Sequence, residues 1–153
     1  ELGFKCYDVS KITKFKEMFD GRVKTLNHLL YSSLLYKREN KIHEKQFFSL
    51  NIPKIDIVIV NLYPFEKMFK KDKKDYLIDM IDIGGPSLLR AASKNYKYIT
   101  PVMFVKDYSN LVKNLNKNNG VTDISFRKNM ALKVFQNTSA YDKIIAKWLN
   151  EKK

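Results

Sequence analysis

A continuous β-branched run from Ile55 to Leu62 constrains the fold of this chain more than any other segment. It reads Ile-Asp-Ile-Val-Ile-Val-Asn-Leu. Such a run is typical of a strand buried on both faces, as in parallel sheets that helices cover. Proline cannot extend a central ladder, so Pro64 marks the end of this strand. A second strand of the same kind is predicted for Tyr98–Val105.

The rest of the chain reads mainly as helices between these strands. Apolar spacing, proline, glycine and capping residues predict a short strand at Lys5–Val9 and a helical turn at Phe15–Phe19. They also predict helices at Leu26–Lys37, Ile42–Leu50, Tyr76–Met80, Ser87–Asn95 and Asp123–Leu149. A further helix is expected after Asp107, which can cap it, and one face of this helix carries Tyr108, Leu111, Val112 and Leu115. Alternating strands and helices indicate an α/β layer with a mainly parallel sheet. With 153 residues and no evident linker, we expect one domain, residues 1–153.

The composition predicts a globular protein of a reducing compartment. Hydrophobic residues make up 44% of the chain, and no apolar run is long enough to cross a bilayer. The single cysteine, Cys6, cannot form an internal disulfide and is expected to pack inside the first strand. With no signal segment at the start, we expect a soluble cytoplasmic protein with no membrane partner.

The net charge of +13 raises the question of a nucleic-acid partner. The basic residues are scattered along the chain, however, and only four of the 29 are arginines. A charge distribution of this kind is usually a solvated surface that helps to attract phosphorylated substrates. A specific nucleic-acid role is therefore the weakest of the functional alternatives.

Three segments concentrate residues that could carry chemistry. Asp20–Thr25 combines a glycine, two cations and a hydroxyl, which can hold a phosphate but can also be an ordinary loop of a lysine-rich chain. Asn61–Phe65 lies where the first strand ends, either as a ligand-binding turn or as a simple strand exit with packed aromatic residues. Asp82–Ser87 places two glycines before a helix that later carries Lys94, so free amide groups could bind an oxyanion, or the glycines could serve a tight turn only.

Other site types are not supported by the sequence. His28 and His43 lack the cysteine or carboxylate spacing of a metal site. Neither a Gly-x-Ser-x-Gly elbow nor a phosphate-binding loop ending in Gly-Lys-Ser/Thr is present. Three of the five glycines fall in the three segments above, which favours a site lined by backbone.

Taken in order, the motifs resemble one family, the inosine monophosphate (IMP) cyclohydrolase domain of bifunctional purine biosynthesis enzymes. The matching stretches are Gly21–Leu26, Val60–Phe65, Ile81–Ala92, Lys94–Asn95, Asp107–Tyr108 and Thr138–Asp142. The resemblance covers nearly the whole chain from Leu2. It implies a methylglyoxal-synthase-like α/β fold, a three-layer sandwich with a mainly parallel sheet. It also implies a homodimer and a fused transformylase domain, which these residues do not include.

The activity that the resemblance implies is ring closure of 5-formamidoimidazole-4-carboxamide ribotide to IMP, with release of water. By match to the family motifs, Lys94 is the principal proton donor and acceptor, Asp82 takes up or orients the carboxamide proton, and Lys24 and Tyr63 polarise and position the substrate. Backbone around Asp82–Gly84 is implied to stabilise the oxyanion. The matching nucleotide contacts are Arg22, Val23, Lys24, Thr25, Val60, Asn61, Asp82, Ile83 and Gly84. No metal and no organic cofactor is implied.

The sequence departs from the family pattern in two ways. The opening strand–helix–strand segment of the family, which supplies much of the ribotide phosphate site, is not matched, so we expect these 153 residues to be inactive alone. Residues that are histidines or glycines in the family are Asn27, Tyr31, Ser32, Ser33, Tyr96 and Asn137 here. A non-catalytic ribotide-binding or regulatory module on the same fold is the main alternative, and the retained quartet of Lys24, Tyr63, Asp82 and Lys94 argues against it.

Overall fold

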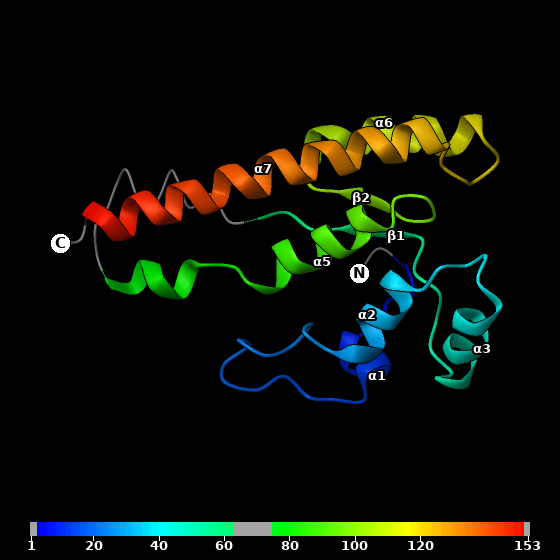
Figure 1. Ribbon diagram of the computed structural model, residues 1–153, viewed down its shortest axis with the longest axis horizontal. Coiled ribbons are helices and arrows are strands. Elements are labelled where there is room, and N and C mark those ends of the chain that lie inside the picture. Colours follow the sequence, from blue (N-terminus) through cyan, green and yellow to red (C-terminus); the bar gives the residue numbers. More distant parts are fainter. Residues whose placement is uncertain (1–2, 63–74, 152–153) are drawn as a thin grey trace. The chain divides into compact units, whose positions relative to one another are not determined.

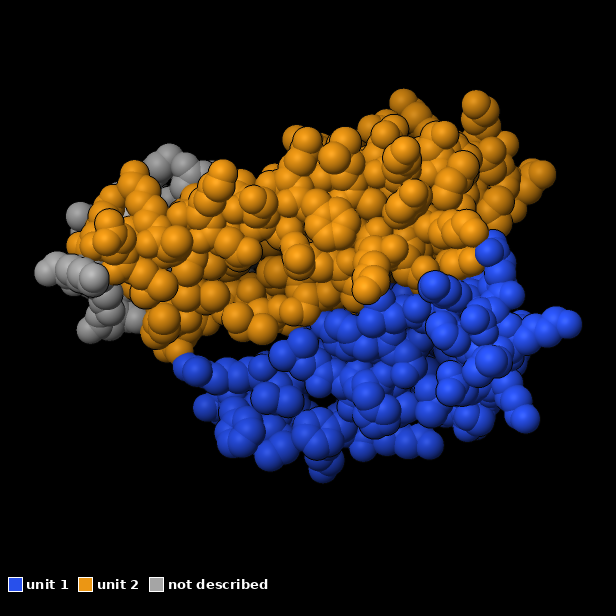
Figure 2. Space-filling view, viewed as in Figure 1, with its two compact units in different colours: residues 1–55 blue, residues 56–153 orange. Residues whose placement is uncertain are grey.

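The computed structural model describes residues 3–62 and 75–151, and the chain forms two compact units, residues 1–55 and residues 56–153 (Figures 1 and 2). No helix among the described residues is both long and apolar enough to cross a membrane. The expectation that residues 1–153 form one domain stays a prediction.

Unit 1 contains three short helices, each of which has an Asp or Asn as its N-cap residue. These are α1 (Val9–Thr13), α2 (His28–Leu35) and α3 (Lys41–Ser49). Side-chain oxygens of Asp8, Asn27 and Asn40 accept hydrogen bonds from backbone N–H groups in the first turns, at 2.8–3.1 Å. Such caps satisfy amides that have no partner within the helix. The predicted helices at Leu26–Lys37 and Ile42–Leu50 are confirmed; α2 is shorter than predicted, and α3 begins and ends one residue earlier than predicted.

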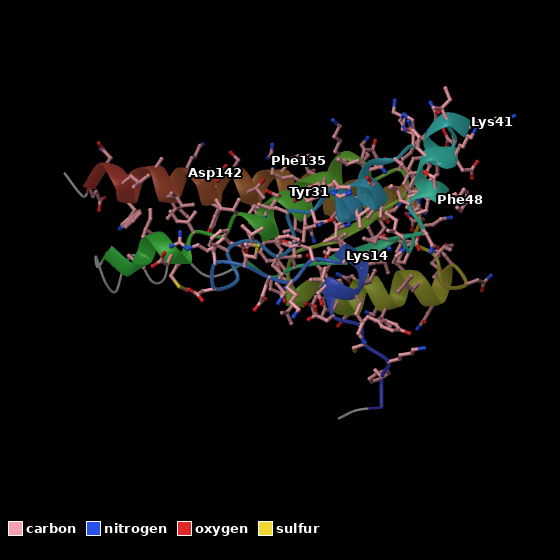
Figure 3. The ribbon with its side chains drawn as sticks, turned by 90° about the horizontal axis from the view of Figure 1, so that it is seen from below. Lys14, Tyr31, Lys41, Phe48, Phe135 and Asp142 are labelled. Carbon is pink, nitrogen blue, oxygen red and sulfur yellow. The ribbon has the colours of Figure 1, made fainter. Side chains whose placement is uncertain are left out.

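The core of unit 1 is small and contains one polar link. Tyr36 and Phe47 are buried and stack with ring centroids 4.2 Å apart. Phe48, the next residue on α3, is exposed, as Figure 3 shows for this helix. The buried hydroxyl of Ser33 donates to Pro53 O at 2.9 Å and accepts from Ile55 N at 3.0 Å. This link ties α2 to the extended segment that ends the unit.

Unit 2 is built on two parallel strands, β1 (Ile57–Ile59) and β2 (Thr100–Val102). Ile57 pairs with Thr100 and Ile59 with Val102. Hydrogen bonds from Thr100 N to Asp56 O and from Val60 N to Val102 O extend the pairing by one residue at each end. Unit 2 also contains the short helices η1 (Asp75–Met80) and η2 (Val105–Asp107), and the longer helices α5 (Gly84–Lys94), α6 (Tyr108–Lys117) and α7 (Ile124–Glu151).

Helix α7 packs along α5 and β2, and its inward face supplies much of the core of unit 2 (Figure 1). Buried residues follow one another at helical spacing along it: Met130, Val134, Thr138, Tyr141 and Trp148. Tyr141 and Trp148 form a cluster with Leu77 of η1. The predicted long helix and its apolar stripe are confirmed.

Three predictions for the start of the chain are wrong. Residues 5–8 are exposed and not in a strand, and Asp8 caps α1 instead. Cys6 is exposed and free, not packed in a core. Phe15–Phe19 is not helical, because Lys14 ends α1 in a left-handed conformation and Met18 pairs with Val23 across a turn.

Several predictions for unit 2 hold in part. Parallel pairing of two strands and a mixed helix–strand architecture are confirmed, but β1 and β2 have three residues each. Ile59 is 49% exposed, so β1 is not buried on both faces within this chain. Helix α5 begins at Gly84, so the glycines lie inside its first turn, and residues 75–80 form a 3-10 helix.

The start of α6 also differs from the prediction. Asp107 occupies the N-cap position, but its side chain makes no cap hydrogen bond. Its buried carboxylate instead accepts from Lys133 Nζ of α7 at 2.6 Å. Val112 is 54% exposed and does not share the buried face of Leu111. Tertiary pairing with α7 thus replaces the local cap that the sequence suggested.

Candidate active site

The exit of β1 is fixed by the side chain of Asn61. Its Nδ2 donates to Met103 O at 2.9 Å, and its Oδ1 accepts from the Tyr108 hydroxyl at 2.8 Å. Asn61 therefore links the ends of β1 and β2 with the first residue of α6. Tyr63 lies outside the described residues. The carboxyl ends of parallel strands are where α/β proteins bind ligands, so this exit is a plausible wall of a site.

The turn before α5 is fixed by Asp82. Its Oδ1 accepts a hydrogen bond from Gly85 N at 2.8 Å, and the half-buried carboxylate lies at the positive end of the helix dipole. The prediction that the glycine amides stay free is therefore wrong for Gly85, because Asp82 itself takes that donor. Ile83 next to it is 59% exposed. The turn presents one carboxylate oxygen and the backbone of residues 83–84 beside it.

The β1 exit and the Asp82 turn meet at Gly85. A Cβ atom on Gly85 would collide with Asp82 Oδ2 and would lie 3.0 Å from both Leu62 Cδ2 and Val60 Cγ1. Gly85 has no positive φ, so glycine is needed here for space. Three of the predicted site residues thereby lie at one place, Val60, Asp82 and Gly84. The side chain of Asn61, between Val60 and Leu62, bonds instead to Met103 and Tyr108.

Lys94 lies at the opposite end of α5 from this meeting point. It is the last residue of the helix and is exposed. At 1.5 Å per residue, the 10 steps from Gly84 to Lys94 separate the two Cα atoms by about 15 Å. Asp82 and Lys94 therefore lie at opposite ends of α5.

The segment around Gly21 forms a turn in unit 1. Met18 and Val23 exchange two backbone hydrogen bonds of 3.0 and 3.2 Å. Between them Phe19, Asp20 and Gly21 all have positive φ, with Gly21 at 88°. Arg22 is exposed and its N–H donates to Phe19 O at 3.1 Å, while Thr25 is half-buried just after the turn.

Lys24 follows this turn and lines a hollow of about 360 Å³ together with Asp8, Ser10, Phe15 and Glu17 among others. Its Nζ lies 2.8 Å from Glu17 Oε2. The hydrogen bond and the charge of Glu17 raise the pKa of Lys24, so the amine stays protonated near neutral pH. The Ser10 hydrogen bonds lower the pKa of Asp8 in the same hollow. An anionic ligand at Lys24 would therefore compete with Glu17.

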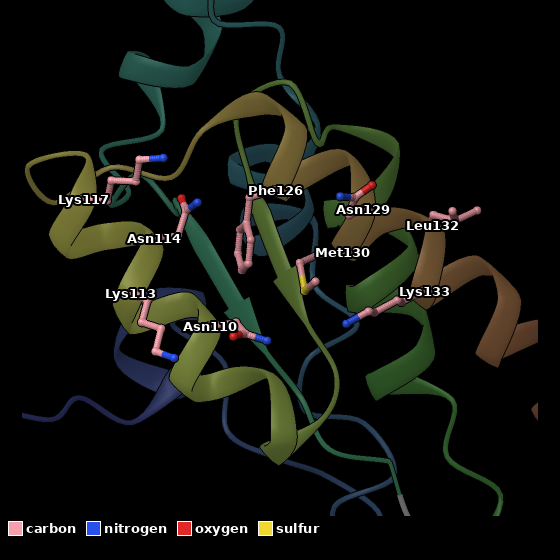
Figure 4. A pocket seen from close by; sticks show the side chains of 9 residues that line it. All are labelled: Asn110, Lys113, Asn114, Lys117, Phe126, Asn129, Met130, Leu132 and Lys133. Atoms are coloured by element: carbon pink, nitrogen blue, oxygen red, sulfur yellow. The ribbon is translucent and has the colours of Figure 1, made fainter.

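Another hollow lies between α6 and α7 and is lined by none of the predicted site residues that the structure describes. Its volume is about 550 Å³, and lysine and asparagine side chains surround Phe126 and Met130 (Figure 4). Lys133 in this lining is already paired with the Asp107 carboxylate.

Sequence reasoning gave no role to two tyrosines that contact the candidate site. The Tyr108 hydroxyl holds Asn61, as above, and the Tyr141 hydroxyl accepts from Asp82 N at 2.9 Å. Both tyrosines lie in stretches that carry the family resemblance, which was the one available signal for them. The hydrogen bonds join residues 47 and 59 positions apart, which no local pattern reveals.

Lys24 and its neighbours belong to unit 1, whereas Asp82, Asn61 and Lys94 belong to unit 2. That the catalytic quartet assembles around one substrate therefore stays a prediction.

Comparison with known proteins identifies the family. The family model described as AICARFT/IMPCHase bienzyme matches residues 92–153. The chain is 45% identical over 153 residues to the bifunctional purine biosynthesis protein PurH of Lactobacillus acidophilus, covering 99% of this chain and 30% of that protein. It is 41% identical to PurH of Ruegeria sp. (strain TM1040), covering 97% of this chain and 28% of that protein.

A solved structure agrees with these relatives. The crystal structure of ForH matches with a TM-score of 0.78 and 26% identity, over 92% of this chain and 74% of that chain. The chain spans about 30% of the length of the curated relatives it matches. With its whole length related to PurH proteins and its second part matched by their family model, the chain belongs to the AICARFT/IMPCHase bienzyme family.

Proposed function

We propose that this chain carries the IMP cyclohydrolase site, which closes the ring of 5-formamidoimidazole-4-carboxamide ribotide to give IMP and water. The supporting observation is the meeting of the β1 exit and the Asp82 turn at Gly85, which puts the Asp82 carboxylate beside Val60, Leu62 and the backbone of α5. Asn61 fixes the same exit through its hydrogen bond to Met103 O. Membership of the family supplies the reaction. The methylglyoxal-synthase-like three-layer arrangement, the cytoplasmic location and the homodimer belong to the same proposal.

The reaction needs proton transfer in two directions. The carboxamide nitrogen attacks the formyl carbon and loses a proton. The former carbonyl oxygen gains two protons and leaves as water, while loss of the formamido N–H proton forms the C=N bond of the ring. Asp82 accepts or orients the carboxamide proton, and Lys94 is the main donor and acceptor toward the departing oxygen. Backbone around Asp82–Gly84 stabilises the oxyanion in this scheme. No metal and no organic cofactor takes part.

The remaining residues are nucleotide contacts by match to the family motifs. They are Arg22, Val23, Lys24, Thr25, Val60, Asn61, Asp82, Ile83 and Gly84. The ion pair with Glu17 raises the pKa of Lys24, and a cationic amine suits polarisation of the substrate better than proton acceptance. Tyr63 positions the reacting groups in this scheme.

One observation favours a second function. Asp82 precedes the first residue of α5 and Lys94 is its last residue, so the two are not neighbours in the unit. A ribotide-binding module without turnover would need the turn at Gly85 but not Lys94.

A spectroscopic assay of IMP formation separates the two functions. It is run on these 153 residues and on a version extended at the start by the opening segment of a curated relative. We expect turnover in the extended version, and Lys94→Ala to lower kcat by about 10²–10⁴-fold, the usual range for loss of a general acid–base. Lys128→Ala, which removes another exposed lysine, is the matched control.

The outcomes are distinct. Ribotide binding without turnover in both versions would replace catalysis with the binding-module function. Equal turnover with and without the extension would contradict the expectation that the opening segment is required.

A further inference from the structure

Tyr141 is a group of unit 2 that the proposed chemistry leaves without a role, yet it touches a residue of the site. Its hydroxyl oxygen accepts a hydrogen bond from the backbone N–H of Asp82 at 2.9 Å. Tyr141 lies on α7, 59 residues further along the chain. The contact is therefore made by tertiary packing alone.

The tyrosine itself is firmly held. It is 8% exposed and forms a buried cluster with Leu77 and Trp148. Met80 and Ile81, the two residues before Asp82, pack against the same cluster. A phenol ring has few rotatable bonds, so a packed tyrosine presents its hydroxyl at a fixed point at little entropic cost.

Asp82 is thus held at two different atoms. Tyr141 holds the backbone nitrogen, and Gly85 N holds one carboxylate oxygen at 2.8 Å. The first bond sets where the turn lies relative to α7, and the second sets how the carboxylate points. Loss of the hydrogen bond to Tyr141 would leave the Gly85 hydrogen bond intact but would free the turn to move.

We propose that Tyr141 is a positioning residue for Asp82. Tyr141 fixes the position of the Asp82 turn relative to α7, so that the Asp82 carboxylate reaches the substrate. The proposal rests on the proposed function, in which Asp82 handles the carboxamide proton. A misplacement of about 1 Å at a reacting group can cost roughly 100-fold in rate, so a single anchoring bond can matter. Burial raises the pKa of Tyr141, so the hydroxyl stays neutral while it accepts this bond.

The test uses Tyr141→Phe, which removes the hydroxyl and keeps the ring. Ile145→Val is the matched control, because Ile145 packs against the same cluster and carries no polar group. Two quantities are measured: the hydrogen-exchange rate of the Asp82 amide by NMR, and kcat and KM for IMP formation in the extended version of the chain. We expect Tyr141→Phe to speed exchange at Asp82 at least about tenfold and to lower kcat about tenfold, with KM within about threefold.

Two results would overturn the proposal. One is unchanged exchange at Asp82 in Tyr141→Phe. The other is an equal fall in kcat in Ile145→Val when the two variants have the same melting temperature, since a merely structural role would affect both alike.

Failure of the proposed function is recognised separately. If the unsubstituted protein makes no IMP, its affinity for IMP replaces kcat as the readout. Weaker IMP binding in Tyr141→Phe, with unchanged binding in Ile145→Val and faster exchange at Asp82, would keep the positioning role and reject the catalysis. A protein that neither turns over nor binds IMP overturns both.

Discussion

The turn at Gly21 in unit 1 and the turn at Gly85 in unit 2 both carry candidate site residues, but they need glycine for different reasons. Gly21 has a φ of 88°, and a Cβ atom there would meet nothing within 4 Å. Gly85 has no positive φ, and its Cβ would strike Asp82, Leu62 and Val60. The first glycine serves the local shape of the backbone, whereas the second serves close packing between distant segments. Only the second identifies a place where site residues converge.

The largest expected effect is that of Gly85→Ala. The added methyl group forces Asp82 and the β1 exit apart, so we expect a loss of about 1–3 kcal/mol in the free energy of unfolding and at least about tenfold weaker IMP binding. Urea unfolding and calorimetry measure the two effects. Ser87→Ala, two residues along the same helix, is the control. Normal IMP binding by Gly85→Ala would show that the close packing has no bearing on the site.

Gly21→Ala is expected to act through the backbone only. An alanine in the left-handed region costs about 1–2 kcal/mol, with no collision. Gly21→Asn should cost less, because asparagine tolerates this conformation. Urea unfolding of both variants measures the difference. An equal cost for alanine and asparagine would contradict a purely conformational role.

A smaller effect is expected from the ion pair beside the Gly21 turn. Glu17→Gln removes the partner that raises the pKa of Lys24, so that pKa should fall toward its ordinary value, as an NMR titration would show. The amine is then free to bind an anion, and affinity for inorganic phosphate should rise a few-fold, by roughly the strength of an exposed ion pair. Glu44→Gln on α3 is the control. Weaker phosphate binding in Glu17→Gln would mean that Glu17 helps to build the site.

The smallest effect is expected from removing the carboxylate that caps a helix in each unit. Hydrogen bonds from Asn114 and from the backbone of Phe126 lower the pKa of Asp123, and Ser10 lowers that of Asp8. A lowered pKa in the folded state adds stability above the unfolded pKa of about 4, and that stability is lost as the pH falls through the folded value.

Asp123 starts a helix of 28 residues and Asp8 one of 5 residues. We therefore expect Asp123→Ala to lower the melting temperature near pH 7 by about 3 °C, Asp8→Ala by less, and both differences to shrink below about pH 4. Thermal unfolding at several pH values measures this. A difference that grows in acid would contradict the assignment of these caps.

The predicted helices at Leu26–Lys37, Ile42–Leu50 and Asp123–Leu149 were found because apolar spacing and Asn or Asp caps are local signals. The same signals misjudged Lys5–Val9, which has no neighbouring strand to pair with in the structure described. They also placed a local cap at Asp107, where a lysine from α7 takes the carboxylate instead. The sequence pattern predicts a helix or strand well where the stabilising contacts come from nearby residues, and poorly where they come from residues far along the chain.

The sequence by itself determined the family, the parallel pairing of the two apolar strands and the identity of the candidate residues, because these depend on residue type, order and local periodicity. Only the tertiary structure decided which candidates meet. It brought Val60 and Asp82 together at Gly85, placed Lys94 at the far end of α5, and assigned the Asp82 amide to Tyr141 of α7. The physical reason is that close packing and hydrogen bonds between segments dozens of residues apart depend on three-dimensional shape, which one-dimensional periodicity does not record.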